Sequence, residues 1–212
     1  MTKTLEEMSE EAKKTDGEVL AIAVIGSAGR GDDARKFCPG LFEEMVKRVS
    51  RTIKQLSGTI KPLRQKIRLV SGGAAWADHV AVALFLEGAV DELHLHFPTD
   101  FGRSKTPVGV GVGPYVNRLH RAFAEVSGVD SLGDIGRAIK MPGCKHFARD
   151  GFFARNTKIA QSADCVIALT WSKDNKPPPG GTSDTWHKSQ SKHKIHISLS
   201  SLVNLVIKPA CP

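Results

Sequence analysis

The chain has 212 residues, of which 41% are hydrophobic and 25% charged, so it is long enough for one sizeable globular core and short for two. Thirty Lys and Arg against 22 Asp and Glu give a net charge of +8, which favours acidic partners such as phosphorylated metabolites or nucleic acid. The aromatic content is only 6%, with a single Tyr, whereas nucleic-acid surfaces usually add stacking aromatics. Nucleic acid is therefore an open but unsupported alternative.

The cysteines and the N-terminus indicate the compartment. The four cysteines form no CxxC pair, so we expect free thiols rather than a disulfide framework. Residues 1–17 are polar and charged, with no apolar run of the signal-peptide type, and no stretch is long enough to span a bilayer. We expect residues 1–17 to be a polar leader, no membrane contact, and a reducing, cytoplasmic location.

The first half of the chain alternates between strand and helix patterns. Val19 to Ile25 is continuously apolar and ends at Gly26, which predicts a central parallel strand buried on both faces. Apolar residues then recur every three or four positions from Leu41 to Leu56, which predicts a helix that ends at Gly58. The elements expected next are a strand over Ile67 to Val70, a helix over Ala74 to Glu87 and a strand over Asp91 to Phe97.

The second half begins with a glycine-rich stretch. Residues 99–114 lack periodicity, which predicts a mobile loop, and we interpret residues 98–145 as an insertion with two short helices. The elements expected in this half are helices over Tyr115 to Val126 and Ser131 to Ile139, a helix over Phe147 to Ser162, a strand over Cys165 to Trp171, a helix over Thr182 to Ser191, a strand over Lys194 to Leu199, and a strand or helix over Ser200 to Ile207. This alternation predicts one Rossmann-like α/β domain over residues 18–207, a doubly wound, mainly parallel sheet with helices on both faces.

Three of the predicted strands end in glycine-rich turns, at Gly26 to Gly31, Ser71 to Ala74 and Gly180 to Ser183. In open parallel sheets, ligands bind beyond the carboxyl ends of the strands, near the point where strand order reverses. Glycine allows close backbone approach, and the following helix offers free N–H groups to phosphate. One such turn could equally be a tight connection, but three at one edge favour a phosphate site.

The pattern of these turns excludes two familiar classes of nucleotide enzyme. Glycines 26, 29 and 31 give G-x-x-G-x-G rather than the dinucleotide fingerprint, and no Walker A sequence is present. We therefore expect neither NAD binding nor ATP hydrolysis, and we predict no cofactor. The histidines lack partners at familiar zinc spacing, so we predict no metal site.

Two segments resemble a known superfamily. Ser71-Gly-Gly-Ala-Ala-Trp-Ala-Asp78 resembles the Ser-Gly-Gly-Ala-x-Gly-Ala-Asp segment of SLOG proteins, which include DprA-like and LOG-like Rossmann folds. Arg155-Asn156 and Pro179-Gly-Gly-Thr182 stand where LOG proteins carry a helix Arg and a Pro-Gly-Gly-x-Gly-Thr-x-Glu-Glu turn. The match runs from Val19 to Leu199 outside the insertion, and looks closest to a SLOG branch with an Arg-Asn helix and a Gly-Gly-Thr-x-Asp-Thr-Trp turn.

The resemblance implies a nucleotide or nucleotide-derived ligand with its phosphate on the glycine turns. The candidate ligand-binding residues are Gly26, Ser27, Arg30, Ser71, Gly72, Gly73, Trp76, Asn156, Gly180, Gly181, Thr182 and Ser183. Arg30 and Arg155 offer guanidinium forks that match phosphate, with a surface salt bridge as the alternative for each. Trp76 either stacks on a base or packs in the core.

In LOG-type phosphoribohydrolases, the motif Arg and a Glu act at the N-glycosidic bond of a nucleoside monophosphate. Arg155 matches the Arg, whereas Ser183 to Trp186 occupy the stretch of the Glu pair, so the candidate carboxylates are Asp184 and Asp78. Asp184 could instead cap its helix. Asp78 could bind a ribose hydroxyl or complement the helix dipole.

Three functions follow in order of preference. The first is binding of a nucleotide or nucleotide-derived ligand, the second is nucleoside 5′-monophosphate N-glycosidase activity with Arg155, Asp184 and Asp78 as catalytic residues, and the third is DprA-like binding of single-stranded DNA. Related folds often dimerise through a helix face, and the helix Leu41 to Leu56 is either such a face or part of the core.

Overall fold

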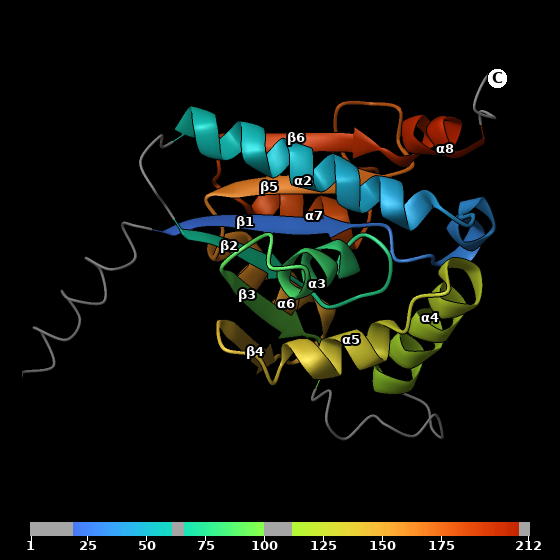
Figure 1. The fold of residues 1–212 in the computed structure, drawn as a ribbon, viewed down its shortest axis with the longest axis horizontal. Helices are drawn as coiled ribbons and strands as arrows, with labels where there is room; N and C mark the ends of the chain where they lie inside the picture. Colours follow the sequence, from blue (N-terminus) through green and yellow to red (C-terminus); the bar gives the residue numbers. More distant parts are fainter. Residues whose placement is uncertain (1–18, 61–65, 100–111, 208–212) are drawn as a thin grey trace, which may run out of the picture.

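The computed structural model describes residues 19–60, 66–99 and 112–207, which form one parallel six-stranded sheet with helices on both faces (Figure 1). The strand order is β4-β3-β2-β1-β5-β6. The strands are β1 (Val19–Gly26), β2 (Lys66–Ser71), β3 (Glu92–Phe97), β4 (Cys144–Ala148), β5 (Cys165–Thr170) and β6 (His193–Ser198). The order reverses at β1, which pairs with β2 on one side and with β5 on the other. The predicted doubly wound α/β fold is confirmed.

The helices form two layers. They are the 3-10 helix η1 (Gly31–Lys36) and the α-helices α2 (Leu41–Ile60), α3 (His79–Leu86), α4 (Val112–Ser127), α5 (Ser131–Ala138), α6 (Gly151–Gln161), α7 (Gly181–Lys188) and α8 (Leu199–Ile207). Figure 1 shows α2, α3 and α5 in front of the sheet and α6 and α7 behind it. None of the helices in the described ranges is long and apolar enough to cross a membrane.

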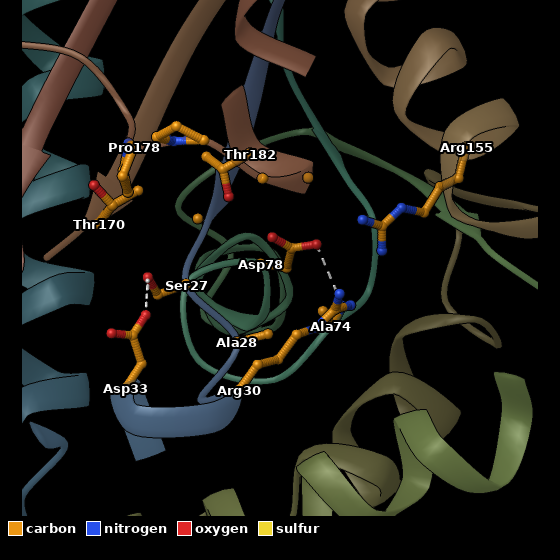
Figure 2. Close-up of a pocket in the computed structure, with 14 residues that line it drawn as sticks. Ser27, Ala28, Arg30, Asp33, Ala74, Asp78, Arg155, Thr170, Pro178 and Thr182 are labelled. Carbon is orange, nitrogen blue, oxygen red and sulfur yellow. Dashed lines mark hydrogen bonds between the residues drawn. The ribbon is translucent and has the colours of Figure 1, made fainter. Parts of the chain in front are cut away.

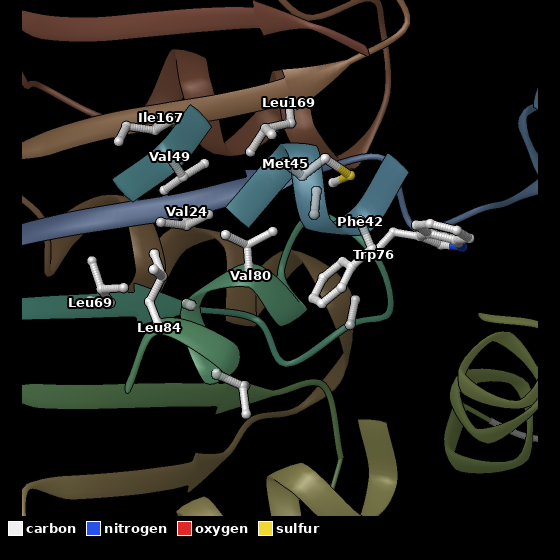
Figure 3. Close-up of a cluster of buried hydrophobic side chains, with 14 of the residues drawn as sticks. Val24, Phe42, Met45, Val49, Leu69, Trp76, Val80, Leu84, Ile167 and Leu169 are labelled. Carbon is white, nitrogen blue, oxygen red and sulfur yellow. The ribbon is translucent and has the colours of Figure 1, made fainter. Parts of the chain in front are cut away.

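The two faces of β1 build two cores of different size. On the front face, Val24 packs with Leu69 and Ile167 of the neighbouring strands against apolar side chains of α2 and α3 (Figure 3). On the back face, Ala21 and Ala23 join a smaller cluster with Ile159 of α6. The short alanine side chains leave room for Ile159 of α6 on this face of the sheet.

The described part of the segment predicted as an insertion contains regular helices and the start of a strand. Residues 112–138 form α4 and α5, and the chain then adds β4 to the edge of the sheet beside β3. The helix predicted from Phe147 therefore begins at Gly151 instead. The strand was missed because Cys144-Lys-His-Phe-Ala148 is short, and as an edge strand it has no fully buried residue and no continuous apolar run.

Other boundaries moved by a few residues. Helix α2 continues through Gly58 to Ile60, and the added β-carbon of an alanine at Gly58 would meet nothing within 4 Å. Helix α3 begins only at His79, because the chain makes an irregular loop over residues 72–78. The last segment is a helix, α8. The predicted leader and most of the predicted mobile loop fall outside the described residues.

Candidate functional site

A cavity of about 190 Å³ lies beyond the carboxyl ends of β1, β2 and β5, at the point where strand order reverses (Figure 2). All three glycine turns reach it. Predicted site residues that line it are Gly26, Ser27, Arg30, Asp78, Arg155, Gly180, Gly181 and Thr182. Residues that line it without having been predicted are Ala28, Asp33, Ala74, Thr170, Pro178 and Pro179. This is the position at which open α/β sheets bind ligands.

The first turn holds β1 tightly against β5. The backbone N–H of Ser27 donates to the carbonyl of Leu169 at 2.9 Å, and the Ser27 hydroxyl donates to Asp33 at 3.3 Å. A β-carbon at Gly26 would collide with the Leu169 carbonyl oxygen and lie 2.6 Å from Cβ of Ala77. Only glycine therefore fits where β1, β5 and the loop after β2 converge.

The second turn places a carboxylate in the cavity. A β-carbon at Gly72 would lie 2.6 Å from Oδ2 of Asp78 and 2.8 Å from Nη1 of Arg155, so both side chains occupy the space left by this glycine. Gly73 has φ +63° and packs against the ring of Phe97. Figure 2 shows Asp78 at the centre of the cavity, with the guanidinium of Arg155 directed towards it.

Ser71, Gly72, Gly73 and Trp76 were predicted to contact the ligand, but none of them lines the cavity. The buried Ser71 hydroxyl donates to the carbonyl of Asp78 at 2.9 Å, so it stabilises the loop over residues 72–78. Trp76 is 3% exposed and stacks on Phe37 at a centroid distance of 4.0 Å. The prediction that Trp76 stacks on a base is therefore wrong, and its packing alternative holds.

A buried histidine supports the glycine turn from the side of α4. Nε2 of His120 donates to the carbonyl of Gly73 at 3.1 Å, and Nδ1 accepts from the hydroxyl of Ser131 at 2.8 Å, which requires the neutral ring. Burial, with a smaller effect of the neighbouring His79, lowers the pKa of His120 from 6.5 to about 4.

This histidine predicts a loss of stability in mild acid. The folded-state pKa is below the unfolded one, so the stabilisation is complete above pH 6.5 and is lost as the pH falls towards 4. Between pH 7 and pH 5 the free energy of unfolding should fall by about 2 kcal/mol through His120. Urea denaturation at both pH values measures this fall in the free energy of unfolding. His120→Gln, which keeps a donor and an acceptor, should make the fall smaller. An equal fall in the variant and the wild type would contradict the attribution to His120. Some acid sensitivity should persist in the variant, because burial also lowers the pKa of His96 to about 4.

Arg155 is the buried cation of the site. It is 9% exposed, and its Nε and Nη2 donate to Oδ1 of Asn156 at 3.2 and 3.0 Å. This arrangement leaves the Nη1 edge towards Gly72 and the cavity. Asn156 is 1% exposed and its amide donates to the carbonyl of Gly181 at 3.2 Å, so it links the guanidinium to the start of α7. Asn156 thus positions Arg155 and the start of α7 without lining the cavity.

Asp184 lies outside the cavity. Its Oδ2 accepts from Nδ2 of Asn156 at 3.1 Å and pairs with Nζ of Lys188 at 2.9 Å. Ser183 also lies away from the cavity lining, with its hydroxyl 3.1 Å from Nδ1 of His187. The carboxylate that faces Arg155 inside the cavity is therefore Asp78 rather than Asp184.

The third turn contributes the N-terminus of α7. Gly180 has φ +143°, a conformation that favours glycine, and its carbonyl accepts from the N–H of Asp184 at 2.9 Å. The N–H groups at the start of a helix have no partner within it, and Gly181 and Thr182 border the cavity. The partial positive charge of this end adds to that of Arg155 and Arg30. The cavity therefore has positive groups on two of its sides.

The ring of Phe152 contacts both arginines, although no sequence motif identified this residue. The guanidinium carbon of the exposed Arg30 lies 4.7 Å from the ring centroid of Phe152, and that of Arg155 lies 5.4 Å from it. Arg30 also lies 5.5 Å from the ring of Tyr115. Cations over aromatic faces are attracted by the ring quadrupole. These contacts hold Arg30 at the rim of the cavity.

Burial destabilises the charged form of Asp78. Burial raises the pKa of its carboxyl, against the opposing effects of Arg155 and of the Ala74 N–H, and burial likewise lowers the pKa of Arg155. A raised folded-state pKa means that the charged form is disfavoured in the folded protein, and that this cost disappears as the pH falls through that pKa. Asp78→Asn should therefore raise the free energy of unfolding at pH 7, as measured by urea denaturation. A lower value would contradict this electrostatic account.

No group of three or more His, Cys, Asp or Glu side chains that could hold a metal ion occurs in the part of the chain that the structure describes. The cavity is lined by two carboxylates, Asp33 and Asp78, and Asp33 is paired with Nζ of Lys36 at 2.8 Å. The cavity lining thus contains one buried carboxylate, Asp78, and one ion-paired carboxylate, Asp33.

One viral protein is similar to the chain over most of its length. No protein-family model matches the chain. The chain is 41% identical over 182 residues to a protein of Acanthamoeba polyphaga mimivirus named Uncharacterized protein R261, and the alignment covers 85% of this chain and 97% of the viral protein. The chain therefore belongs to the same family as this mimivirus protein.

Proposed function

We propose that the cavity binds the phosphate of a nucleotide or of a nucleotide-derived ligand. The observation that carries the proposal is the meeting of a buried guanidinium, Arg155, with the N-terminus of α7 at the point where strand order reverses. Backbone N–H groups at a helix start and a fork of guanidinium donors are the two groups best suited to phosphate.

The size of the cavity supports a ligand that is only partly enclosed. Pockets that bury a drug-sized molecule have volumes of roughly 300–1,000 Å³. This cavity of about 190 Å³ is smaller, which favours enclosure of a phosphate and a sugar rather than of a whole nucleotide. The base then lies towards the rim, where Arg30 and Phe152 offer a cationic and an aromatic surface.

The backbone of the second turn supports a SLOG-like origin for this site. Trp76 has φ +59°, a left-handed conformation in which glycine is strongly favoured. The SLOG segment that resembles Ser71 to Asp78 has glycine at this position. We propose that the loop keeps the backbone path of that segment while the Trp76 ring fills the core beneath it.

Calorimetric titration with ribonucleoside monophosphates and with the matching nucleosides tests the proposal. At least one monophosphate should bind, and its nucleoside should bind at least about 100-fold more weakly, because several charge-assisted hydrogen bonds are lost with the phosphate. Bound ligand should also raise the melting temperature. Equal affinity for nucleoside and nucleotide, or no binding by any monophosphate, would contradict the proposal.

The position of Asp78 favours a second candidate, hydrolysis of the N-glycosidic bond of a nucleoside monophosphate. A buried carboxylate whose pKa is raised, next to a guanidinium, is the kind of group that positions water or stabilises a developing oxocarbenium ion. Chromatographic detection of free base from each monophosphate tests this activity. Release that is lost in Asp78→Asn and retained in Asp184→Asn would support Asp78 as the working carboxylate, and no release from any monophosphate would contradict the candidate.

A further inference from the structure

Asp78 is a negative group inside a cavity that otherwise favours anions. Its side chain is buried, with the residue 4% exposed, and Oδ2 receives a long hydrogen bond of 3.4 Å from the N–H of Ala74. The backbone N–H of Gly26 is also hydrogen-bonded to this carboxyl. An ionised carboxylate has about four acceptor positions, so about two remain for a ligand. Any ligand group beside Asp78 must therefore donate hydrogen bonds.

A phosphate cannot be that group. A phosphate at the start of α7 is stabilised by the N–H groups near Gly181 and Thr182, but phosphate oxygens against Asp78 would place two negative charges in contact. The part of the ligand that follows the phosphate is the part that lies towards Asp78. In a nucleotide, this part is the sugar.

The absence of a side chain at Gly72 allows a hydrogen-bond acceptor of Asp78 and a donor of Arg155 to lie near each other. Oδ2 of Asp78 and Nη1 of Arg155 lie 2.6 and 2.8 Å from the position of its missing β-carbon. These two side chains fill the space at Gly72, but both also line the cavity, where a hydroxyl group between them could donate to the carboxylate and accept from the guanidinium. Two neighbouring hydroxyls would use the remaining acceptor positions of Asp78, which is the arrangement offered by the diol of ribose.

We infer that Asp78 accepts hydrogen bonds from the ribose diol and thereby makes the site selective for ribonucleotides over deoxyribonucleotides. This inference rests on the proposed nucleotide binding. Asp78 is in this role a specificity residue, with Arg155 holding the other side of the hydroxyl. The acidic group acts at the sugar, while the helix start and the guanidinium act at the phosphate.

The test compares the tightest-binding ribonucleoside monophosphate with its 2′-deoxy and 3′-deoxy forms by calorimetry on the full chain. Loss of one hydroxyl that donates to a charged acceptor should weaken binding about tenfold or more. Asp78→Asn should abolish this discrimination. The same variant should bind inorganic phosphate more tightly than the wild type, because a repulsive charge has gone, which a merely structural role of Asp78 would not produce.

Asp32→Asn is the matched control, since it removes one negative charge at a side chain that is 89% exposed. It should keep the discrimination of the wild type. Wild-type protein that binds the ribo-, 2′-deoxy- and 3′-deoxy-monophosphates equally would overturn the inference while leaving the proposed function intact, and this comparison needs no variant that must fold. If no monophosphate binds at all, the proposed function and the inference both fail.

Discussion

Gly26→Ala should lower the free energy of unfolding by about 3 kcal/mol or more, because the added methyl has no room at the junction of three segments. The new β-carbon would overlap the carbonyl oxygen of Leu169, which belongs to the neighbouring strand, and would lie 2.6 Å from Cβ of Ala77. Backbone atoms in a central strand cannot move aside without breaking the β1–β5 ladder. Urea denaturation at pH 7 measures the loss.

Gly58→Ala is the matched control for this substitution. Gly58 lies within α2, and a β-carbon there would meet nothing within 4 Å. Alanine at such a position should raise the free energy of unfolding by about 0.5–1 kcal/mol, because glycine is a poor helix former. If Gly26→Ala is as stable as the wild type, β1 and β5 are not packed as described.

Arg155→Ala should reduce affinity for the nucleoside monophosphate by about 100-fold or more, since the guanidinium supplies more than one charge-assisted hydrogen bond in a buried position. Arg155→Lys should also bind poorly. Lysine keeps the charge but lacks the planar fork whose Nε and Nη2 both donate to Asn156 and thereby aim Nη1 at the cavity. Calorimetric titration of each variant gives the affinities.

Arg51→Ala controls for the loss of one positive charge. Arg51 is exposed on α2, where Nε donates to the carbonyl of Lys47 at 3.3 Å. Its removal should change affinity by less than about twofold, because an exposed charge away from the site is screened by salt. Equal affinity in the wild type and Arg155→Ala would mean that the ligand does not bind through Arg155.

Much of the fold could be predicted because its central strands are buried on both faces. Such strands read as continuous apolar runs, as in Val19 to Ile25, and the alternation with helices then fixes a parallel sheet. The edge strand β4 could not be recognised in this way, since an edge strand needs no such run. The start of α3 was also misplaced, because the loop over residues 72–78 is shaped by contacts with Phe97 and His120, which are distant in sequence.

The candidate site could be predicted as far as local chemistry reaches. The glycine turns and Arg155 could be predicted as site residues from their residue types and from their positions near the ends of predicted strands. The roles of the two aspartates depend on which side chains lie opposite them. Asp184 and Asp78 each follow a glycine pair, yet Asp184 faces Asn156 and Lys188 while Asp78 faces the cavity. Such partners belong to other elements, so only the folded arrangement separates the two.

A crystal structure of the protein with a bound ribonucleoside monophosphate tests the central claim most directly. The phosphate should lie at the N–H groups of Gly181 and Thr182 within reach of Arg155, and the sugar hydroxyls should lie against Asp78. A ligand bound elsewhere, or one whose phosphate lies away from α7 while this cavity contains only solvent, would contradict the account.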